Sequence, residues 1–147
     1  MTSDRPRIDL GWTSIDLCWP PACQVGSALR ILTACAAHER GALALCDHGG
    51  LPALVKLLQR SDTGMQGNAA LCLAECAKND KCLAVLAVLP IVPPLLAIAH
   101  NGKDGPQKNA AIALGRLAKN AHLLEAIRDN HGIEILARAM KGKVRGL

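Results

Sequence analysis

The sequence predicts an all-α fold, a right-handed superhelical solenoid built from three-helix repeats. The first observation is an internal repeat: Leu51-Pro-Ala-Leu-Val-Lys-Leu-Leu58 aligns with Val92-Pro-Pro-Leu-Leu-Ala-Ile-Ala99 after a shift of 41 positions. The second is that the same shift superimposes Leu32, Leu73 and Leu114. The third is apolar spacing of three and four residues, which is typical of amphipathic helices. A helical period of about 40 to 47 residues indicates an array in which neighbouring units bury each other's apolar faces.

Glycine, proline and polar residues divide each predicted unit into three helices. Gly49-Gly50 and Gly132 precede apolar stretches, so we expect them to end a short first helix and begin a second. Pro52 and Pro93 then stand early in the second helix, where proline is tolerated. Polar residues at 59–64 and 100–105 predict the loops that follow it.

The third helix is the longest element of the predicted unit. We expect it at residues 65–78 and again at residues 106–119, each with one broad apolar stripe rich in alanine. A further third helix at residues 26–37 opens the array, and a second helix that ends near Met140 closes it. The sequence therefore predicts two complete repeats flanked by partial ones within an array that spans residues 26–147.

Residues 1–25 do not belong to the predicted array. This stretch contains Trp12, Trp19 and Pro20-Pro21, and it has neither a copy at the 41-residue shift nor a sustained helical period. We expect an irregular, poorly ordered leader. Trp12 or Trp19 could cover the apolar face that the first helix of a truncated stack leaves open.

Composition favours a single tightly packed domain. The chain has 147 residues, half of them hydrophobic, but no Phe or Tyr, so the core must consist of small and branched side chains. Its net charge is +5, and part of this charge lies in the basic end formed by Arg138, Lys141, Lys143 and Arg145. A basic end of this size is more often solvated than bound to nucleic acid.

One uncharged stretch, residues 82–99, approaches the length of a membrane span. Pro90, Pro93 and Pro94 lie in its middle, where they interrupt a continuous helix. The repeat shift also aligns it with residues 43–58, which include the charged Asp47 and Lys56. We therefore predict two short helices joined by a sharp turn and no membrane span.

Seven cysteines are an odd number, and no apolar signal segment precedes them, so we expect a reducing compartment and a cytoplasmic protein. The residues that suggest a metal site are Cys46, His48, Cys72, Cys76 and Cys82. The repeat aligns Cys35 and Cys76 with Leu117, and Cys72 with Ile31 and Ala113, all positions that stay apolar. Buried thiols that act as small hydrophobic side chains explain this pattern better than zinc, and we expect no metal and no cofactor.

The sequence offers little support for an enzyme. It contains no Tyr, four serines and no glycine-rich phosphate loop. His38-Glu39 and Cys46-Asp47-His48 are adjacent in sequence, and adjacent residues on a helix do not face one another. We predict a non-catalytic protein.

The third helices carry the motif that identifies a family. They read Ala69-Ala-Leu-Cys-Leu-Ala-Glu-Cys-Ala77 and Ala110-Ala-Ile-Ala-Leu-Gly-Arg-Leu-Ala118, each after an apolar second helix. This pattern resembles the armadillo-repeat family over about residues 26 to 141. The resemblance implies a three-helix unit and a protein-interaction scaffold. HEAT repeats are the second choice, since they have two helices per unit and lack the glycines between them.

A narrower resemblance concerns residues 107–118 together with His131-Gly-Ile-Glu-Ile-Leu136. These stretches are similar to the C-terminal armadillo part of the tetratricopeptide- and armadillo-repeat proteins that act in cytoplasmic assembly of axonemal dynein arms. The resemblance implies a role in cilia, and the present chain would then be a C-terminal piece or short form. The chain departs from that pattern because it contains no tetratricopeptide repeat.

Armadillo proteins of the nuclear-import and adhesion classes bind extended peptides along their third helices, with a recurring Trp and an Asn four residues later. The Trp-equivalent positions here are Arg30, Leu71 and Ile112, and the Asn-equivalent positions are Ala34, Glu75 and Arg116. Recognition of a basic import signal is therefore not expected. The same face still presents a mixed apolar and charged strip.

The residues of this third-helix strip that could bind a protein partner are Arg30, Asn68, Leu71, Glu75, Asn109, Ile112 and Arg116. The alternative is a solvated face on which Glu75 and Arg116 pair across adjacent repeats. The alternative function is an RNA-binding helical-repeat protein, although the array lacks aromatic residues on which bases could stack. The sequence leaves the identity of the partner and the oligomeric state open.

Overall fold

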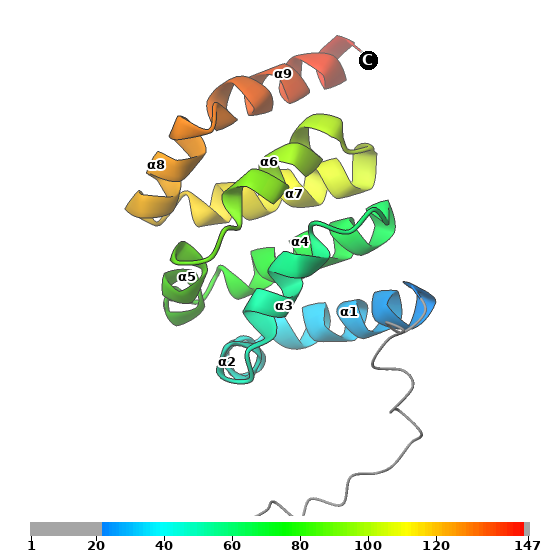
Figure 1. Cartoon of the computed structure of the whole chain (residues 1–147), viewed down its shortest axis with the longest axis vertical. Helices are drawn as coiled ribbons and strands as arrows, with labels where there is room; N and C mark the ends of the chain where they lie inside the picture. Colours follow the sequence, from blue (N-terminus) through cyan, green and yellow to red (C-terminus); the bar gives the residue numbers. More distant parts are fainter. Residues whose placement is uncertain (1–21, 146–147) are drawn as a thin grey trace, which may run out of the picture.

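The computed structural model describes residues 22–145 and shows an all-helical solenoid over that range (Figure 1). Nine helices make up these residues: α1 (Ala22–Ala36), α2 (Glu39–Asp47), α3 (Gly50–Leu57), α4 (Thr63–Cys76), α5 (Asp80–Ala87), α6 (Val92–Asn101), α7 (Asp104–Leu117), α8 (Ala121–Asp129) and α9 (Gly132–Arg145). The predicted leader falls largely on residues outside this range, so the proposed cover by Trp12 or Trp19 lies outside the described residues.

The helices repeat in the predicted order. α2–α4 and α5–α7 are the two complete three-helix units, α1 is a third helix that precedes them, and α8–α9 are a first and a second helix that follow them. Figure 1 shows the third helices α1, α4 and α7 in one layer and the second helices α3, α6 and α9 in another. Each third helix packs on the third helix of the next unit, α1 on α4 and α4 on α7.

The core runs continuously along this stack. Leu73 and Leu114 are each 1% exposed, which confirms both as equivalent core positions. Alanines at the crossing of α4 and α7 are also buried, including Ala69, Ala70 and Ala110 at 0% exposure. Such small side chains let the third helices approach closely. At Gly67 an added Cβ would lie 3.1 Å from the ring of Pro106 on α7, so a larger side chain would push the two helices apart.

The third helices begin and end two residues earlier than the sequence predicts. α4 begins at Thr63 because the Asp62 carboxylate accepts a hydrogen bond from the Met65 N–H and caps the helix. α7 begins at Asp104, so Pro106 lies within the first turn, where its missing N–H has no intrahelical partner to lose. The two residues after each helix, 77–78 and 118–119, were predicted to be helical and instead form turns.

The two outer helices are longer than the sequence predicts. α1 begins at Ala22, four residues before the expected start at Gly26, and α9 continues to Arg145, beyond the expected end near Met140. Glycine lowers helix stability by only about 1 kcal/mol relative to alanine, so a helix can continue through Gly26 and through Gly142. Glycine does matter at Gly49, whose φ of 71° lies in the left-handed region.

The cysteine prediction is correct for the inner units and wrong for the first helix. Cys72, Cys76 and Cys82 are each 0% exposed, whereas Cys35 is exposed. A hydrogen bond with Cys72 and burial raise the pKa of the Cys76 thiol, and burial raises the pKa of Cys82 to about 11. Both are therefore protonated at neutral pH. Cys35 lacks this cover because no described helix precedes α1.

The uncharged stretch forms two helices, as predicted. α5 and α6 meet at an angle of 93°. Among the described residues no single helix is long and apolar enough to cross a membrane, and this bent pair meets the length and composition test only when its two helices are taken together.

Candidate interaction surface

Six residues of the third-helix strip lie on the adjacent helices α4 and α7, and the seventh, Arg30, lies on α1. The structure therefore brings the two equivalent triplets side by side: Asn68, Leu71 and Glu75 beside Asn109, Ile112 and Arg116. Arg30 is exposed and takes no part in the hydrogen bonds that join α4 and α7. The strip is thus centred on the contact between the two complete units.

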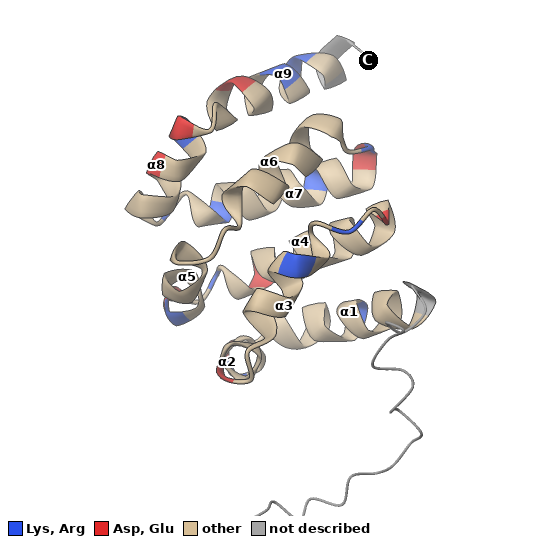
Figure 2. Cartoon of the chain, in the orientation of Figure 1, with Lys and Arg blue, Asp and Glu red and all other residues tan. Residues whose placement is uncertain are grey.

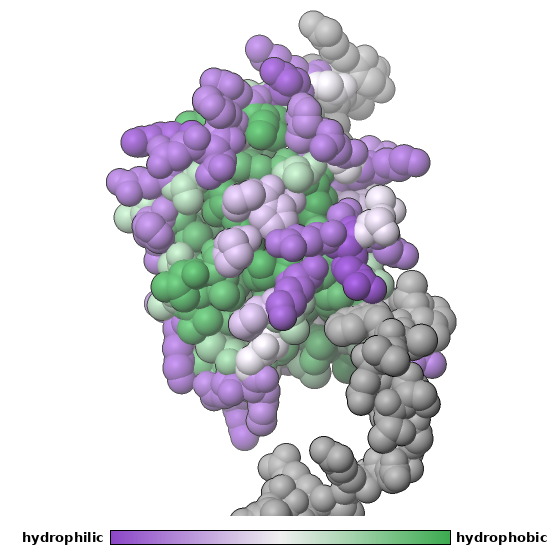
Figure 3. All heavy atoms as spheres, in the orientation of Figure 1, coloured by the Kyte–Doolittle hydropathy of each residue, from purple (hydrophilic) through white to green (hydrophobic). Residues whose placement is uncertain are grey.

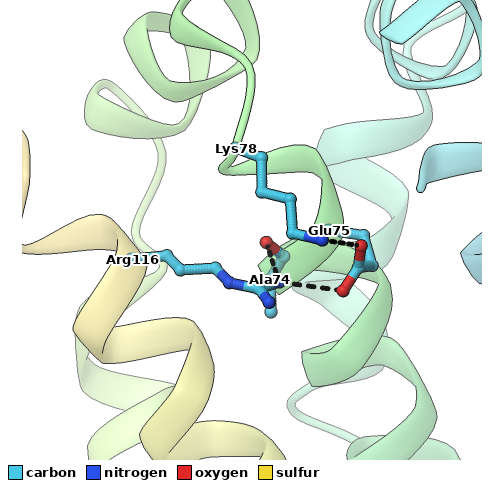
Figure 4. A network of polar contacts seen from close by, with 4 residues as sticks. All are labelled: Ala74, Glu75, Lys78 and Arg116. Carbon is cyan, nitrogen blue, oxygen red and sulfur yellow. Dashed lines mark hydrogen bonds and ion pairs between the residues drawn. The ribbon is translucent and has the colours of Figure 1, made fainter. Parts of the chain in front are cut away.

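The most ordered part of the strip is a charged network across the two units (Figure 4). The Arg116 guanidinium donates from Nη1 to Glu75 Oε1 at 2.9 Å and to the Ala74 carbonyl oxygen at 2.7 Å. The Lys78 ammonium donates to the other carboxylate oxygen, Glu75 Oε2, at 2.6 Å. One carboxylate therefore binds two cations, one from its own helix and one from the next repeat.

Burial in this network separates Glu75 from an ordinary surface carboxylate. Its side chain is 13% exposed, and that of Arg116 is 26% exposed. Burial alone raises the pKa of Glu75, but hydrogen bonds from Lys78 and Arg116 outweigh it and hold that pKa below its usual value. Glu75 is consequently ionised at neutral pH, and the network holds both side chains in place.

The sequence left open whether Glu75 and Arg116 pair across repeats, and the structure shows that they do. Both side chains are partly buried, so this pair does not lie on a fully solvated face. The third helices pack closely enough that the Arg116 guanidinium reaches the end of α4, where unpaired carbonyl groups attract a cation. The most exposed member of the network is Lys78, whose side chain is 50% exposed.

Asn109 also connects the two units. Its side-chain amide donates a hydrogen bond to the Gly67 carbonyl oxygen at 2.9 Å. This bond satisfies a backbone acceptor where the two helices pack closely. Asn68, Leu71 and Ile112 are all partly buried. The strip has two apolar residues. Ile112 packs against the hydrophobic core, whereas Leu71 is not among the side chains that do so.

The sequence analysis did not identify a pair of repeat-equivalent glutamines that order the loop before each third helix. Gln107 donates its amide to the Ala99 carbonyl oxygen at 2.8 Å, and Gln66 donates to the equivalent Leu58 carbonyl oxygen at 3.2 Å. The signal was present, since both glutamines begin the repeated motifs Gln66-Gly-Asn-Ala-Ala70 and Gln107-Lys-Asn-Ala-Ala111. Lys78 aligns with Lys119 after the 41-residue shift, but its ion-pair partner Glu75 aligns with Arg116, so the repeat does not indicate the Lys78–Glu75 contact.

Beyond the network, the surface alternates between apolar and charged residues. Figure 2 shows acidic and basic residues distributed over the helices, with basic residues along α9. On the face in Figure 3, hydrophobic surface lies between hydrophilic side chains. Within residues 22–145 no three His, Cys, Asp or Glu side chains are grouped so that they could hold a metal ion.

Comparison with known families agrees with this geometry. Residues 38–78 match the family described as Armadillo/beta-catenin-like repeat. The match covers α2, α3 and α4, which is one complete structural unit. A search of curated proteins finds no match to the chain. Armadillo repeats are typically non-catalytic and generally serve as protein-interaction scaffolds, so this unit of the chain is similar in sequence to a protein-binding repeat.

Proposed function

We propose that the chain is a protein-interaction scaffold that presents the third-helix strip to a protein partner in the cytoplasm, during assembly of dynein arms for cilia. The observation that carries the scaffold role is the pre-ordered network of Glu75, Arg116 and Lys78 across two repeats. A surface whose side chains are already fixed loses less conformational freedom when a partner binds. The narrower ciliary role rests on the resemblance of residues 107–118 and 131–136 to dynein-arm assembly proteins.

The strip favours a partner segment with mixed apolar and charged side chains. Leu71 offers a partly exposed apolar contact, while Lys78 after α4 and Arg30 on α1 offer exposed cations. Aromatic groups for base stacking are missing from the described helices, since the two aromatic residues of the chain are Trp12 and Trp19. No observation therefore favours RNA as the partner.

The test is affinity capture from ciliated cells with the full chain as bait, with and without nuclease. We expect nuclease-resistant capture of dynein-arm subunits or their assembly factors. Leu71→Ser and Arg30→Glu should each lower capture, by about ten-fold if the residue is a binding hot spot. Lys56→Glu, at an exposed position on α3, is the matched charge-reversal control and should capture normally.

Three results would count against the proposal in different ways. Nuclease-sensitive capture would favour RNA binding. Normal capture by both strip variants would move the binding surface away from the third helices. Capture of proteins unrelated to cilia, with loss in the strip variants, would keep the scaffold and exclude the dynein-arm role.

A further inference from the structure

The two ends of the described stack are open in complementary ways. On α1, Ile31 is 65% exposed and Leu32 is 36% exposed. Their equivalents on α4, Cys72 and Leu73, are 0% and 1% exposed. α1 therefore carries an apolar face with the pattern of a core, but the second helix that would cover this face is absent from the described residues. The α1 face comprises Gln24, Ala28, Ile31, Leu32 and Cys35.

At the other end, no third helix follows α9 within the described residues. On α9, Ile133 is 61% exposed and Met140 is 71% exposed, while the equivalent Leu51 on α3 and Leu58 at its C-cap are 0% and 2% exposed. Between α7 and α9 lies an open groove of about 440 Å³. The residues that line this α7–α9 groove are Gln107, Lys108, Ala111, Ile112, Leu136, Ala139 and Met140. In the complete units the corresponding faces are covered by the third helix of the unit.

We propose that two copies of this chain associate head to tail, with α1 of one copy filling the α7–α9 groove of the other. Among residues 22–145, α8 and α9 are a first and a second helix with no third helix after them, and α1 is a third helix with no first or second helix before it. Joined, they complete one three-helix unit. The joint reproduces the packing of α4 on α7 and of α6 on α7, which the chain already uses within itself.

Charge supports this register at a position outside the apolar contact. Within the chain, Lys81 at the start of α5 pairs with Asp47 at the end of α2 at 3.5 Å. In the repeat, Arg40 is equivalent to Lys81, and Asp129 is equivalent to Asp47. The proposed joint would therefore place Arg40 of one copy beside Asp129 of the other. Both residues are exposed, and their charges are opposite in the required sense.

The joint is heterologous, because each copy uses a different surface. Such contacts generate open chains of copies unless the rotation closes into a ring. The wild-type chain should therefore show a mass that rises with concentration beyond that of a dimer or reaches a closed ring. Analytical ultracentrifugation of the full 147-residue chain measures this directly.

Two variants that block opposite ends test the geometry. Leu32→Glu places a charge in the α1 face, and Met140→Glu places one in the α7–α9 groove. Both residues are exposed enough in the isolated chain for folding to persist, which circular dichroism will check. Each variant alone should be monomeric, whereas an equimolar mixture should form a 1:1 dimer, because one intact end of each kind remains.

A charge swap tests the register. Arg40→Glu and Asp129→Arg should each weaken association, by about five-fold for an exposed ion pair, and the double variant should recover it. Lys103→Glu, at the N-cap of α7 and not among the residues that line the α7–α9 groove, is the control.

Self-association is measured by ultracentrifugation and the scaffold role by partner capture, so the two proposals can fail independently. A wild-type chain that stays monomeric at all concentrations would overturn the proposal of self-association. If Leu32→Glu then shifted the tryptophan emission, residues 1–21 would be the occupant of the α1 face instead. Loss of association in Leu32→Glu with no effect of Met140→Glu would show a symmetric contact between two α1 helices.

Discussion

Arg116 illustrates how a single side chain joins two repeats. Its guanidinium binds the Glu75 carboxylate and the Ala74 carbonyl oxygen, both on the preceding third helix. An exposed ion pair contributes little to stability, but partial burial and a second hydrogen bond increase the contribution. The pair therefore stabilises the contact between units as well as shaping the strip.

A double-mutant cycle measures this contact. Arg116→Ala and Glu75→Ala should each lower the free energy of unfolding, and the double variant should be less destabilised than the sum, with a coupling energy on the order of 1 kcal/mol. Lys78→Ala is the control for the other half of the network and should couple to Glu75 more weakly, because Lys78 is more exposed. Additive effects of Arg116→Ala and Glu75→Ala would contradict a stabilising bond.

The same network predicts a pH dependence. Because the folded-state pKa of Glu75 is lowered, its contribution to stability is present above the unfolded-state value, about 4.3, and is lost as pH falls through the lower folded-state pKa. The free energy of unfolding of the wild type should therefore fall more steeply below about pH 4.3 than that of Glu75→Gln. Denaturant titrations over this range check the slope, and parallel curves for the two proteins would contradict the lowered pKa.

At the scale of the helix, equivalent residues differ in burial according to their place in the stack. Leu73 and Leu114 are 1% exposed, while their equivalent Leu32 is 36% exposed. The three leucines have the same helical environment in sequence and differ in whether a preceding second helix covers them. Replacing each of these leucines with alanine changes helix propensity equally at the three sites, so differences in stability report the effect of burial.

Leu73→Ala and Leu114→Ala should each cost about 2 to 5 kcal/mol of unfolding free energy, the usual range for a buried leucine. Leu32→Ala should cost clearly less, because its side chain is partly exposed in the isolated chain. Chemical denaturation at a concentration low enough to prevent self-association provides the measurement. An equal cost at all three positions would show that the α1 face is covered in solution.

At the scale of the molecule, stability should vary along the stack. Each repeat contacts its neighbours alone, so the central helices have a partner on both sides and the outer ones on one. α4 packs on the third helices of both neighbouring units, α1 and α7. α9 packs on α6 of one neighbouring unit and on α8 of its own unit. Local opening is therefore easiest at the ends.

Hydrogen exchange followed by mass spectrometry tests this gradient. In dilute protein, the amides of α4 and α7 should exchange slowest, and those of α8 and α9 fastest. Raising the protein concentration should slow exchange in α1 and α9 if these helices form the proposed joint, with α5 as an internal reference. Uniform protection along the chain would indicate a single cooperative unit without open ends.

The sequence by itself determined the repeat, the order of three helices per unit and the core leucines Leu73 and Leu114. These features follow from local periodicity and from glycine and proline positions, which act within a few residues. Helix ends were less well determined, because a cap such as Asp62 or an early proline such as Pro106 shifts a boundary by about two residues.

Only the tertiary structure decided which apolar positions are covered and what the charged strip residues bind. Cys35 and Cys76 have the same place in the repeat, yet the first is exposed and the second buried. Arg116 was placed on the third-helix strip with its contacts left open, and its guanidinium reaches the Ala74 carbonyl oxygen. In both cases the outcome depends on a helix one repeat away in the chain, and a pattern read along one helix contains no information about whether that neighbour is present or how closely it packs.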